Sequence, residues 1–424
     1  MKEKRYVCID LKSFFASCEC VERGLDPFKV NLVVADPERS ENTVCLAITP
    51  AMKALGIKNR CRVGDIPQTV EYIIAKPRMK LYMAKSAEIY SVYLRYISPE
   101  DIHIYSIDEC FIDVTDYMKL YKKTEFEIAK LLTDEVYKKT GIRATVGIGT
   151  NLFLAKVALD VTAKKSPDFT GYLDEEKFKK TMWHHTPITD VWNIGHGTAE
   201  RLLKYGIHDL YGVAHFDEKV LYKEFGINAE LLIDHANGIE PCTIADIKKY
   251  RTHSTSLSTS QILFKNYDFS AAFLIVKEML DGLTLELIDH EFVTDSVSLY
   301  VGYANKSVKT TGGTVKINEF TDSYKKLLTH FKKLYCDTTY KDKPIRKITI
   351  GLNDLVDKTH KTFDFFTDER AEKKEHDISE TVIDIKKKFG KNAIIKGMSL
   401  EENATARVRN RLVGGHNGGE DEHR

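Results

Sequence analysis

Residues 104–115 read IYSIDECFIDVT, two short runs of alternating residues that meet at an adjacent pair of carboxylates. The β-branched and aromatic residues on either side predict two paired strands joined at Asp108-Glu109. A tight hairpin turn normally favours Asn-Gly or Asp-Gly, because the preferred turns need positive φ. An acidic pair at this point therefore suggests a chemical role, although exposed turn residues without any role remain the alternative.

A third carboxylate, Asp10, ends the near-continuous apolar strand YVCID. If this strand neighbours the hairpin, three carboxylates converge at one sheet edge, where their charges repel. Divalent cations relieve such repulsion, since Mg²⁺ prefers oxygen ligands and two ions about 3.5–4 Å apart can drive nucleotidyl transfer. Asp113 is expected to face solvent or a neighbouring strand instead of a metal.

The composition is that of a globular protein, with 43% hydrophobic and 29% charged residues in a chain of 424. The sequence has no apolar run near the roughly 20 residues needed to cross a bilayer, and its start does not read as a signal peptide. The 8 cysteines form no CxxC pair, which favours reduced thiols over a zinc site or disulfides. We therefore expect a cytoplasmic protein that does not bind membranes.

The order of predicted elements divides the chain. Strands alternate with helices up to residue 166, which indicates an α/β or α+β core. Short helices follow over 167–240, a polar connector over 241–253, and a β-α-β-β-α-β pattern over 254–355 that predicts a split βαβ domain. The charged end, 356–424, contains one predicted helix and a final GGHNGGEDEHR that looks disordered.

Two features suggest a polyanionic partner. Residues 300–350 hold eleven Lys or Arg against four Asp or Glu, a local excess of seven beside a net charge of only +1. A solvated lysine-rich surface is the alternative. The segment IGHGTAERL predicts a helix–turn–helix hairpin with Gly195 and Gly197 in the turn and Thr198 at a helix N-cap, where free N–H groups can bind phosphate without reading sequence.

Together these motifs resemble the Y-family translesion DNA polymerases over nearly the whole chain. The matching segments occur in the family's order: VCIDLKSFFASCE, YSIDECFIDVT, TVGIGTNLFLAKVALDVTAKK and IGHGTAERL. The carboxy-terminal KKKFGKNAIIKGMSLEENATARVRNRLVGGH is similar to that of bacterial UV-damage polymerases carried by plasmids and prophages.

The resemblance implies an α+β multidomain, right-hand polymerase fold. Its expected parts are a palm at 1–30 and 76–166, small fingers at 31–75, a helical thumb with the helix-hairpin-helix at 167–240, a linker at 241–253, a split-βαβ little finger at 254–355 and a C-terminal tail at 356–424. Such a polymerase has an open site, copies damaged templates with low fidelity, and acts as a monomer.

The resemblance also assigns site residues. It implies that Asp10, Asp108 and Glu109 are the catalytic metal ligands, with the Leu11 carbonyl, for two Mg²⁺ ions and with Mn²⁺ as an alternative ion. Phe15 falls at the position that excludes a 2′-hydroxyl, although a core aromatic is the alternative. The backbone amides of Ser13, Phe14 and Phe15 are implied to hold the triphosphate of the dNTP.

The sequence departs from the family in the fingers. Where many relatives carry a Tyr and, three residues later, an Arg, this chain has Pro50 and Lys53. Proline cannot donate a hydrogen bond, so Thr49 would have to substitute, and Lys53 keeps the charge without the bidentate fork. A one-residue insertion near VTAKK leaves Lys164 or Lys165 as the triphosphate lysine, and we choose Lys164.

The remaining expectations concern partners. The little finger should grip primer–template DNA through lysines such as Lys306, Lys309 and Lys316. TFDFF, with Thr362, Phe363, Phe365 and Phe366, is expected to bind the sliding clamp, whereas QILF at 261–264 is expected to be core packing. A catalytically silent DNA-binding or accessory protein with the same fold is the main alternative function, and a two-metal phosphodiesterase is a more distant one.

Overall fold

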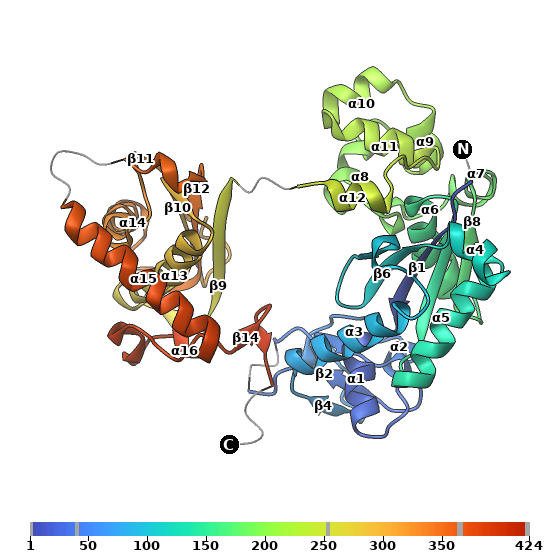
Figure 1. Ribbon diagram of the computed structural model, residues 1–424, viewed down its shortest axis with the longest axis horizontal. Helices are drawn as coiled ribbons and strands as arrows, with labels where there is room; N and C mark the ends of the chain where they lie inside the picture. Colours follow the sequence, from blue (N-terminus) through green and yellow to red (C-terminus); the bar gives the residue numbers. More distant parts are fainter. Residues whose placement is uncertain (1–2, 39–41, 252–254, 363–367, 420–424) are drawn as a thin grey trace. The chain divides into compact units, whose positions relative to one another are not determined.

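The structure is a computed structural model that describes residues 3–38, 42–251, 255–362 and 368–419. The chain forms two compact units, the first of Met1–Tyr250 with His416–Arg424 and the second of Arg251–Gly415 (Figure 1). Within the described residues, no helix is long and apolar enough to cross a membrane. We describe each unit by itself.

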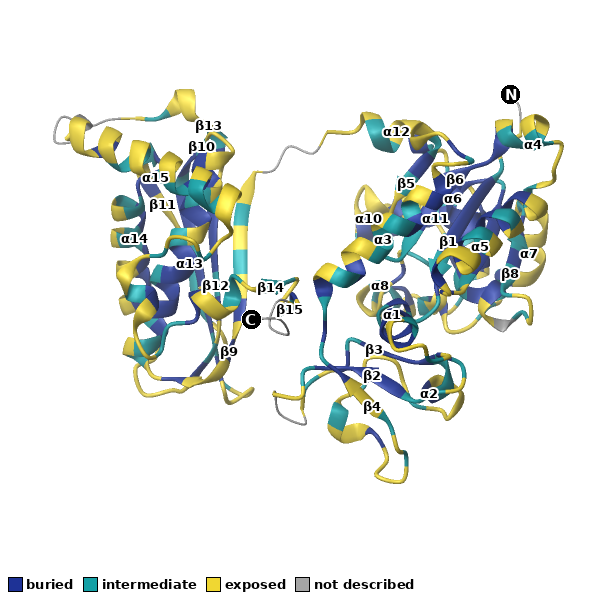
Figure 2. Ribbon diagram, turned by 60° about the horizontal axis from the view of Figure 1, so that its bottom comes forward, coloured by how far each residue is buried: buried dark blue, intermediate teal, exposed yellow. Residues whose placement is uncertain are grey.

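The first unit is built on a five-stranded sheet in the order β5-β6-β1-β7-β8, whose central strands are buried (Figure 2). Only the β7–β8 pair is parallel. Its strands are β1 (Tyr6–Leu11), β5 (Ile102–Ile104), β6 (Glu109–Asp113), β7 (Ala144–Gly149) and β8 (Thr170–Leu173). The accompanying helices are α1 (Phe14–Glu22), α3 (Met79–Tyr93), α4 (Thr115–Tyr121), α5 (Glu125–Thr140) and α6 (Leu152–Val157). This sheet is the expected palm.

Helix α6 lies unusually close to strand β7 because the sequence VGIG provides two glycines there. A Cβ on Gly147 would lie 2.1 Å from the Ala155 carbonyl oxygen, and one on Gly149 would lie 2.3 Å from the Ala155 nitrogen. Any side chain would therefore push the helix away. This close packing brings the face of α6 that carries Lys156 against the end of the palm sheet.

The expected fingers are a three-stranded sheet in the order β3-β2-β4, with β2 (Leu32–Val34), β3 (Ala47–Ile48) and β4 (Ile73–Ala75). The short helix α2 (Pro50–Ala54) follows β3. Pro50 is its first residue, where a missing N–H costs no helical hydrogen bond. The proline therefore has a local structural use, as the start of α2.

The expected thumb is helical: α7 (Glu175–Met182), α8 (His196–Leu203), α9 (Leu210–Ala214), α10 (Glu218–Phe225) and α11 (Asn228–Ala236). Two of our boundaries differ from the structure. Residues after 167 were expected in the thumb, but β8 pairs with β7 and so belongs to the palm sheet. The polar connector at 241–253 contains helix α12 (Ile244–Lys249), because Thr243 and Asp246 form a capping box and Ile244 is buried.

The second unit has the expected β-α-β-β-α-β order: β9 (Ser256–Tyr267), α13 (Phe269–Asp289), β10 (Phe292–Tyr303), β11 (Thr311–Thr321), α14 (Tyr324–Thr338) and β12 (Ile345–Asn353). The strand order is β11-β10-β12-β9, and every pair is antiparallel. Strands β9 and β10 therefore run in the same direction with β12 between them, which confirms the split βαβ arrangement. The short strand β13 (Val356–Asp357) also pairs with β10.

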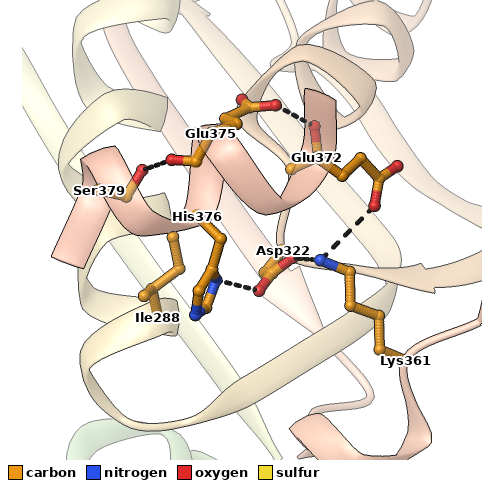
Figure 3. Close-up of a pocket in the computed structure, with 8 residues that line it drawn as sticks. Ile288, Asp322, Lys361, Glu372, Glu375, His376 and Ser379 are labelled. Atoms are coloured by element: carbon orange, nitrogen blue, oxygen red, sulfur yellow. Dashed lines mark hydrogen bonds and ion pairs between the residues drawn. The ribbon is translucent and has the colours of Figure 1, made fainter. Parts of the chain in front are cut away.

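The charged C-terminal region is not simply a tail. Helix α15 (Glu369–Phe389) packs on α13, and α16 (Ala406–Arg409) follows. Figure 3 shows the contacts that hold α15: Asp322 forms an ion pair with Lys361 and a hydrogen bond with His376 Nδ1 at 3.0 Å, and Glu372 lies 3.5 Å from Lys361 Nζ. The expectation of a disordered end at 414–424 is wrong for its first part, because this segment contains strand β15 (His416–Asn417), which belongs to the first unit. Strand β14 (Leu412–Val413), just before it, belongs to the second unit.

Candidate active site

The register of the palm sheet brings the predicted carboxylates to one end of it. Asp10, near the end of β1, is the cross-strand partner of Glu109, the first residue of β6. The N–H of Leu11 donates to the Asp108 carbonyl at 2.9 Å, which ties the residue before Glu109 to the same place. The carboxylates of all three residues therefore belong to one edge of the sheet.

The turn that carries Asp108 differs in detail from the prediction. It spans residues 105–108, because the N–H groups of Tyr105 and Ser106 both donate to the Glu109 carbonyl at 3.0 Å and Glu109 already begins β6. The Ser106 hydroxyl donates to Asp108 Oδ1 at 2.6 Å, and Ser86 of α3 donates to the Ile107 carbonyl at 2.6 Å. The turn is thus fixed from both sides.

The negative charges of the neighbouring carboxylates affect the pKa of Asp10. Burial, followed by the charges of Asp108 and Glu109, raises the pKa of Asp10 to about 7, while Lys164 and Lys156 oppose the rise. A carboxyl group in this position favours a nearby cation, and hard oxygen ligands are those that Mg²⁺ prefers. The donor set therefore fits a divalent cation in chemistry and in charge.

No cluster of three or more metal-ligating side chains occurs among the described residues, however. Two of the carboxylates are engaged with protein groups instead. Glu109 Oε1 contacts Lys156 Nζ at 2.7 Å and accepts from Cys8 Sγ at 3.2 Å, while Asp108 Oδ1 accepts from Ser106. Both Glu109 contacts use the same oxygen, which leaves Oε2 for another ligand.

Lys156 is a functional candidate that the sequence prediction missed. Its side chain is 8% exposed and lies 2.7 Å from Glu109 and 3.0 Å from Asp160. Burial lowers the pKa of Lys156, but the carboxylates of Asp160 and Glu109 outweigh that effect and leave it raised. A signal was present in the sequence, because Lys156 is the one charged residue in the otherwise apolar run LFLAKVAL.

The one-residue insertion near Lys164 has a structural counterpart. After α6 the chain forms a π-helical turn, η3 (Ala158–Thr162), and then a short 3₁₀ turn, η4 (Ala163–Lys165). A π turn accommodates an additional residue inside a helix and is often found at functional sites. Here it leaves Lys164 Nζ 2.9 Å from Asp160 Oδ1. Charge effects also link Lys164 to Asp10, whereas the side chain of Lys165 lies outside the described residues, so the choice between the two lysines stays a prediction.

The predicted nucleotide-facing residues begin helix α1. Ser13 adopts φ 47° as the N-cap, and Phe14 and Phe15 form the first turn, whose N–H groups have no acceptor within the helix. Phe14 is buried, whereas Phe15 is half-buried and packs against Tyr82, with the ring centroids 4.9 Å apart and the rings tilted by 45°. The arrangement presents amide donors and one aromatic ring together.

Three lysines from different elements, Lys12, Lys53 and Lys164, interact electrostatically with Asp10 or with one another. Burial lowers the pKa of Lys12, and Lys53 and Lys164 lower it further. Desolvation of its amino group also lowers the pKa of Lys53, and the charge of Asp10 opposes that shift. The residue as a whole is nevertheless solvent exposed. Lys12 was not among the predicted residues, although it follows Asp10-Leu11 directly.

Thr49 is not brought into this group. It is fully buried, and its hydroxyl accepts from the Leu32 N–H at 3.1 Å, inside the fingers sheet. The proposed substitution of Thr49 for a missing Tyr hydroxyl therefore has no support in the geometry. Lys53 remains as the cation of the fingers near the site.

The predicted thumb hairpin lies at the start of α8, with one correction. Gly195 is the N-cap and the helix begins at His196, so Thr198 lies inside the first turn and does not cap it. Its N–H donates to the Gly195 carbonyl at 3.1 Å. Gly195 and Gly197 are exposed and have open space where a side chain would be, so a large group can approach the backbone there.

The predicted lysines of the second unit differ in their surroundings. Lys306 and Lys309 are exposed in the connection between β10 and β11. Lys316 is exposed as well, but its Nζ lies 2.8 Å from Asp295 and 3.4 Å from Asp354. Its charge is therefore partly neutralised within the protein.

The two candidate clamp-binding segments, QILF and TFDFF, also differ in their surroundings. In QILF, Gln261 is 8% and Leu263 1% exposed, which confirms core packing for those two, whereas Ile262 and Phe264 are 69% and 46% exposed. In TFDFF, Phe363, Phe365 and Phe366 lie outside the described residues. The Thr362 hydroxyl accepts from the Phe320 N–H at 2.8 Å, so it is bonded to the end of β11.

Comparison with known proteins gives concordant matches. The sequence model of the impB/mucB/samB family matches residues 9–160, and that of the family's C-terminal domain matches residues 254–365. The chain is similar to two proteins of Bacillus subtilis (strain 168), each over 422 residues. It is 30% identical to the "Putative UV-damage repair protein UvrX", covering 97% of each chain, and 29% identical to "DNA polymerase IV 2", covering 98% of this chain and 99% of that one.

Among solved structures, the chain is similar to a Y-family DNA polymerase chimera of Dbh and Dpo4 with a TM-score of 0.64. The likeness covers 83% of this chain and 99% of that chain at 20% sequence identity, so it concerns the fold.

Proposed function

The chain belongs to the impB/mucB/samB family and is a Y-family translesion DNA polymerase, and we propose that it transfers nucleotides by a two-metal mechanism at Asp10, Asp108 and Glu109. The observation that carries the proposal is the cross-strand pairing of Asp10 with Glu109 at the sheet edge that also holds Asp108. The three carboxylates and the Leu11 carbonyl would hold the ions. Bound Mg²⁺ would activate the primer 3′-hydroxyl and stabilise the leaving phosphate.

The surrounding residues would orient the two substrates. Lys12, Lys53 and Lys164 would neutralise the triphosphate of the dNTP, and the first-turn amides of α1 would hydrogen-bond to it. Phe15 would lie under the sugar and exclude a 2′-hydroxyl. The thumb loop at Gly195 and Gly197 would hold the DNA backbone without reading its sequence.

The second unit offers a sheet face suited to DNA. On the side away from α13 and α14, small residues lie in register across all four strands: Thr314, Ser298, Gly351 and Ser258. A backbone can approach such a surface closely, and the exposed Lys306 and Lys309 lie at one end of the β10–β11 pair. We propose that this face contacts primer–template DNA through salt-dependent phosphate contacts.

A direct test of the proposed function is primer extension on an undamaged template with Mg²⁺ and each dNTP in turn. Incorporation that follows the template base supports the polymerase. Binding of primer–template without incorporation would favour a catalytically silent protein. Cleavage of the DNA would favour a phosphodiesterase.

The protein is expected to act as a monomer, which size-exclusion chromatography with light scattering can check.

We further propose that the segment 363–366 recruits the sliding clamp. Replacing Phe365 and Phe366 by Ala should abolish clamp pulldown, with a loss of at least about 10³-fold in affinity, since aromatic anchors contribute about 2–4 kcal/mol each to binding. Distributive synthesis without the clamp should not change. The matched control is Ile262→Ala with Phe264→Ala, which removes the exposed residues of QILF. If the control and not the test variant loses the clamp, the assignment moves to β9.

A further inference from the structure

A line of four alternating charges crosses the candidate active site. It runs from Glu109 through Lys156 and Asp160 to Lys164, with successive contacts of 2.7, 3.0 and 2.9 Å between nitrogen and oxygen. The exposed fraction of the side chain is low at Glu109 (10%) and Lys156 (8%) and higher at Asp160 (22%) and Lys164 (51%). The line therefore leads from the buried carboxylate cluster to the solvent-facing lysine.

Asp160 divides its two carboxylate oxygens between the two lysines. Oδ2 contacts Lys156, which lies against Glu109, and Oδ1 contacts Lys164. One side chain thus sets the separation of two cations that act on different parts of the site. Lys156 neutralises the Glu109 carboxylate, and Lys164 is one of the cations that act on Asp10, Lys12 and Lys53.

The backbone under Asp160 is held from the sheet side. A Cβ on Gly171 of β8 would lie 2.5 Å from the Ala158 carbonyl oxygen and 2.8 Å from the Ala163 nitrogen, at the two ends of the π turn. A Cβ on Gly147 of β7 would lie 2.3 Å from the Leu159 nitrogen. Two strands therefore pack directly on the turn, and rigid support of this kind is what a precisely placed side chain needs.

We propose that Asp160 is a positioning residue, which fixes Lys156 beside Glu109 and Lys164 toward the incoming triphosphate so that the two substrates are aligned together. The inference rests on the proposed polymerase function. Asp160 touches neither substrate and acts through the two lysines. The competing interpretation is an ordinary helical ion pair, and exposed pairs of that kind contribute little.

The test compares Asp160→Asn with wild type in steady-state single-nucleotide incorporation on primer–template DNA. We expect KM for the dNTP to rise about 10-fold because Lys164 loses its anchor, and kcat to fall by a similar factor because Lys156 is left with Glu109 alone. The Kd for primer–template, measured by fluorescence anisotropy, should stay within about 2-fold of wild type. A smaller fraction of folded enzyme would lower the apparent kcat alone, so the rise in KM separates the positioning role from a loss of folding.

The chain provides a matched control in Asp134→Asn. Asp134 forms an exposed ion pair with Lys130 at 3.0 Å on α5, with the same i,i+4 spacing and the same residue types. This variant should have the same KM, kcat and Kd as wild type. Asp160→Glu, which keeps the charge, should recover part of the lost activity, and it remains informative if Asp160→Asn is poorly folded.

A double-mutant cycle with Lys164→Met provides the decisive comparison. If Asp160 acts through Lys164, the double variant should show nearly the same KM as Lys164→Met alone. Independent, multiplicative effects would overturn the inference, as would an Asp160→Asn variant that behaves like Asp134→Asn. A wild type without template-dependent incorporation would instead refute the polymerase mechanism itself, and the positioning role with it.

Discussion

Template-directed incorporation should fall by at least about 10³-fold, or about 4 kcal/mol in activation free energy, when Asp108 is replaced by Asn and Glu109 by Gln. The replacements keep the shape of both side chains but remove the two charges that meet Asp10 at the sheet edge. Neutral amides are weak ligands for Mg²⁺, so the hydroxyl activation and phosphate stabilisation that metal ions supply would be lost. Primer extension with saturating dNTP and Mg²⁺ measures the effect.

The controls for this experiment come from the same region. Asp113 lies four residues beyond Glu109 in β6, but its Oδ2 pairs with Lys4 at 2.7 Å and its Oδ1 accepts from the Thr115 N–H at 3.0 Å. Asp113→Asn should therefore lower stability more than activity. Lys156 keeps Asp160 as a partner in the double variant, which protects the fold from an unpaired buried charge. Undiminished incorporation by the double variant would contradict the proposed catalytic site.

The same region shows which inferences the sequence supports. Alternation of residues predicts the β6 strand, and the apolar run before Asp10 predicts β1, because burial on one or both faces sets the pattern of side chains. The carboxylates could be placed together because both strands end at one edge. The pattern could not reveal that the turn spans 105–108 or that Ser86 of α3 supports it, since that contact joins residues 21 positions apart.

Residues that act through distant partners were harder to predict. Lys156 looks out of place in an apolar helix until Glu109 is placed beside it by the packing of α6 on β7. Lys316 lies in a basic segment, yet Asp295 and Asp354 reach it from other parts of the second unit. Composition records charges without their neighbours. For the same reason, composition did not predict helix α12 in the polar connector, nor the packing of α15 on α13 in the charged C-terminal region.

Discrimination against ribonucleotides should fall by about 100-fold when Phe15 is replaced by Ala. A 2′-hydroxyl pressed against an aromatic ring loses its hydrogen bonds to water, which costs about 1–3 kcal/mol, and steric overlap adds to that cost. The ring is suited to this role because it cannot readily move aside. The tilted ring of Tyr82 packs against it with the centroids 4.9 Å apart, and the Tyr82 hydroxyl donates at 2.7 Å to the buried carboxylate of Glu19, which also binds Arg78.

The measurement is the ratio of kcat/KM for a dNTP to that for the matching rNTP. Phe15→Tyr is the control, because it keeps the ring and should keep the ratio close to wild type. The Ala variant should retain dNTP incorporation within about 10-fold, since Phe15 is half-buried and the neighbouring Phe14 supplies the fully buried ring of the first turn. An unchanged ratio in a folded and active Ala variant would assign Phe15 to core packing, and the exclusion of ribonucleotides would then have to come from another residue.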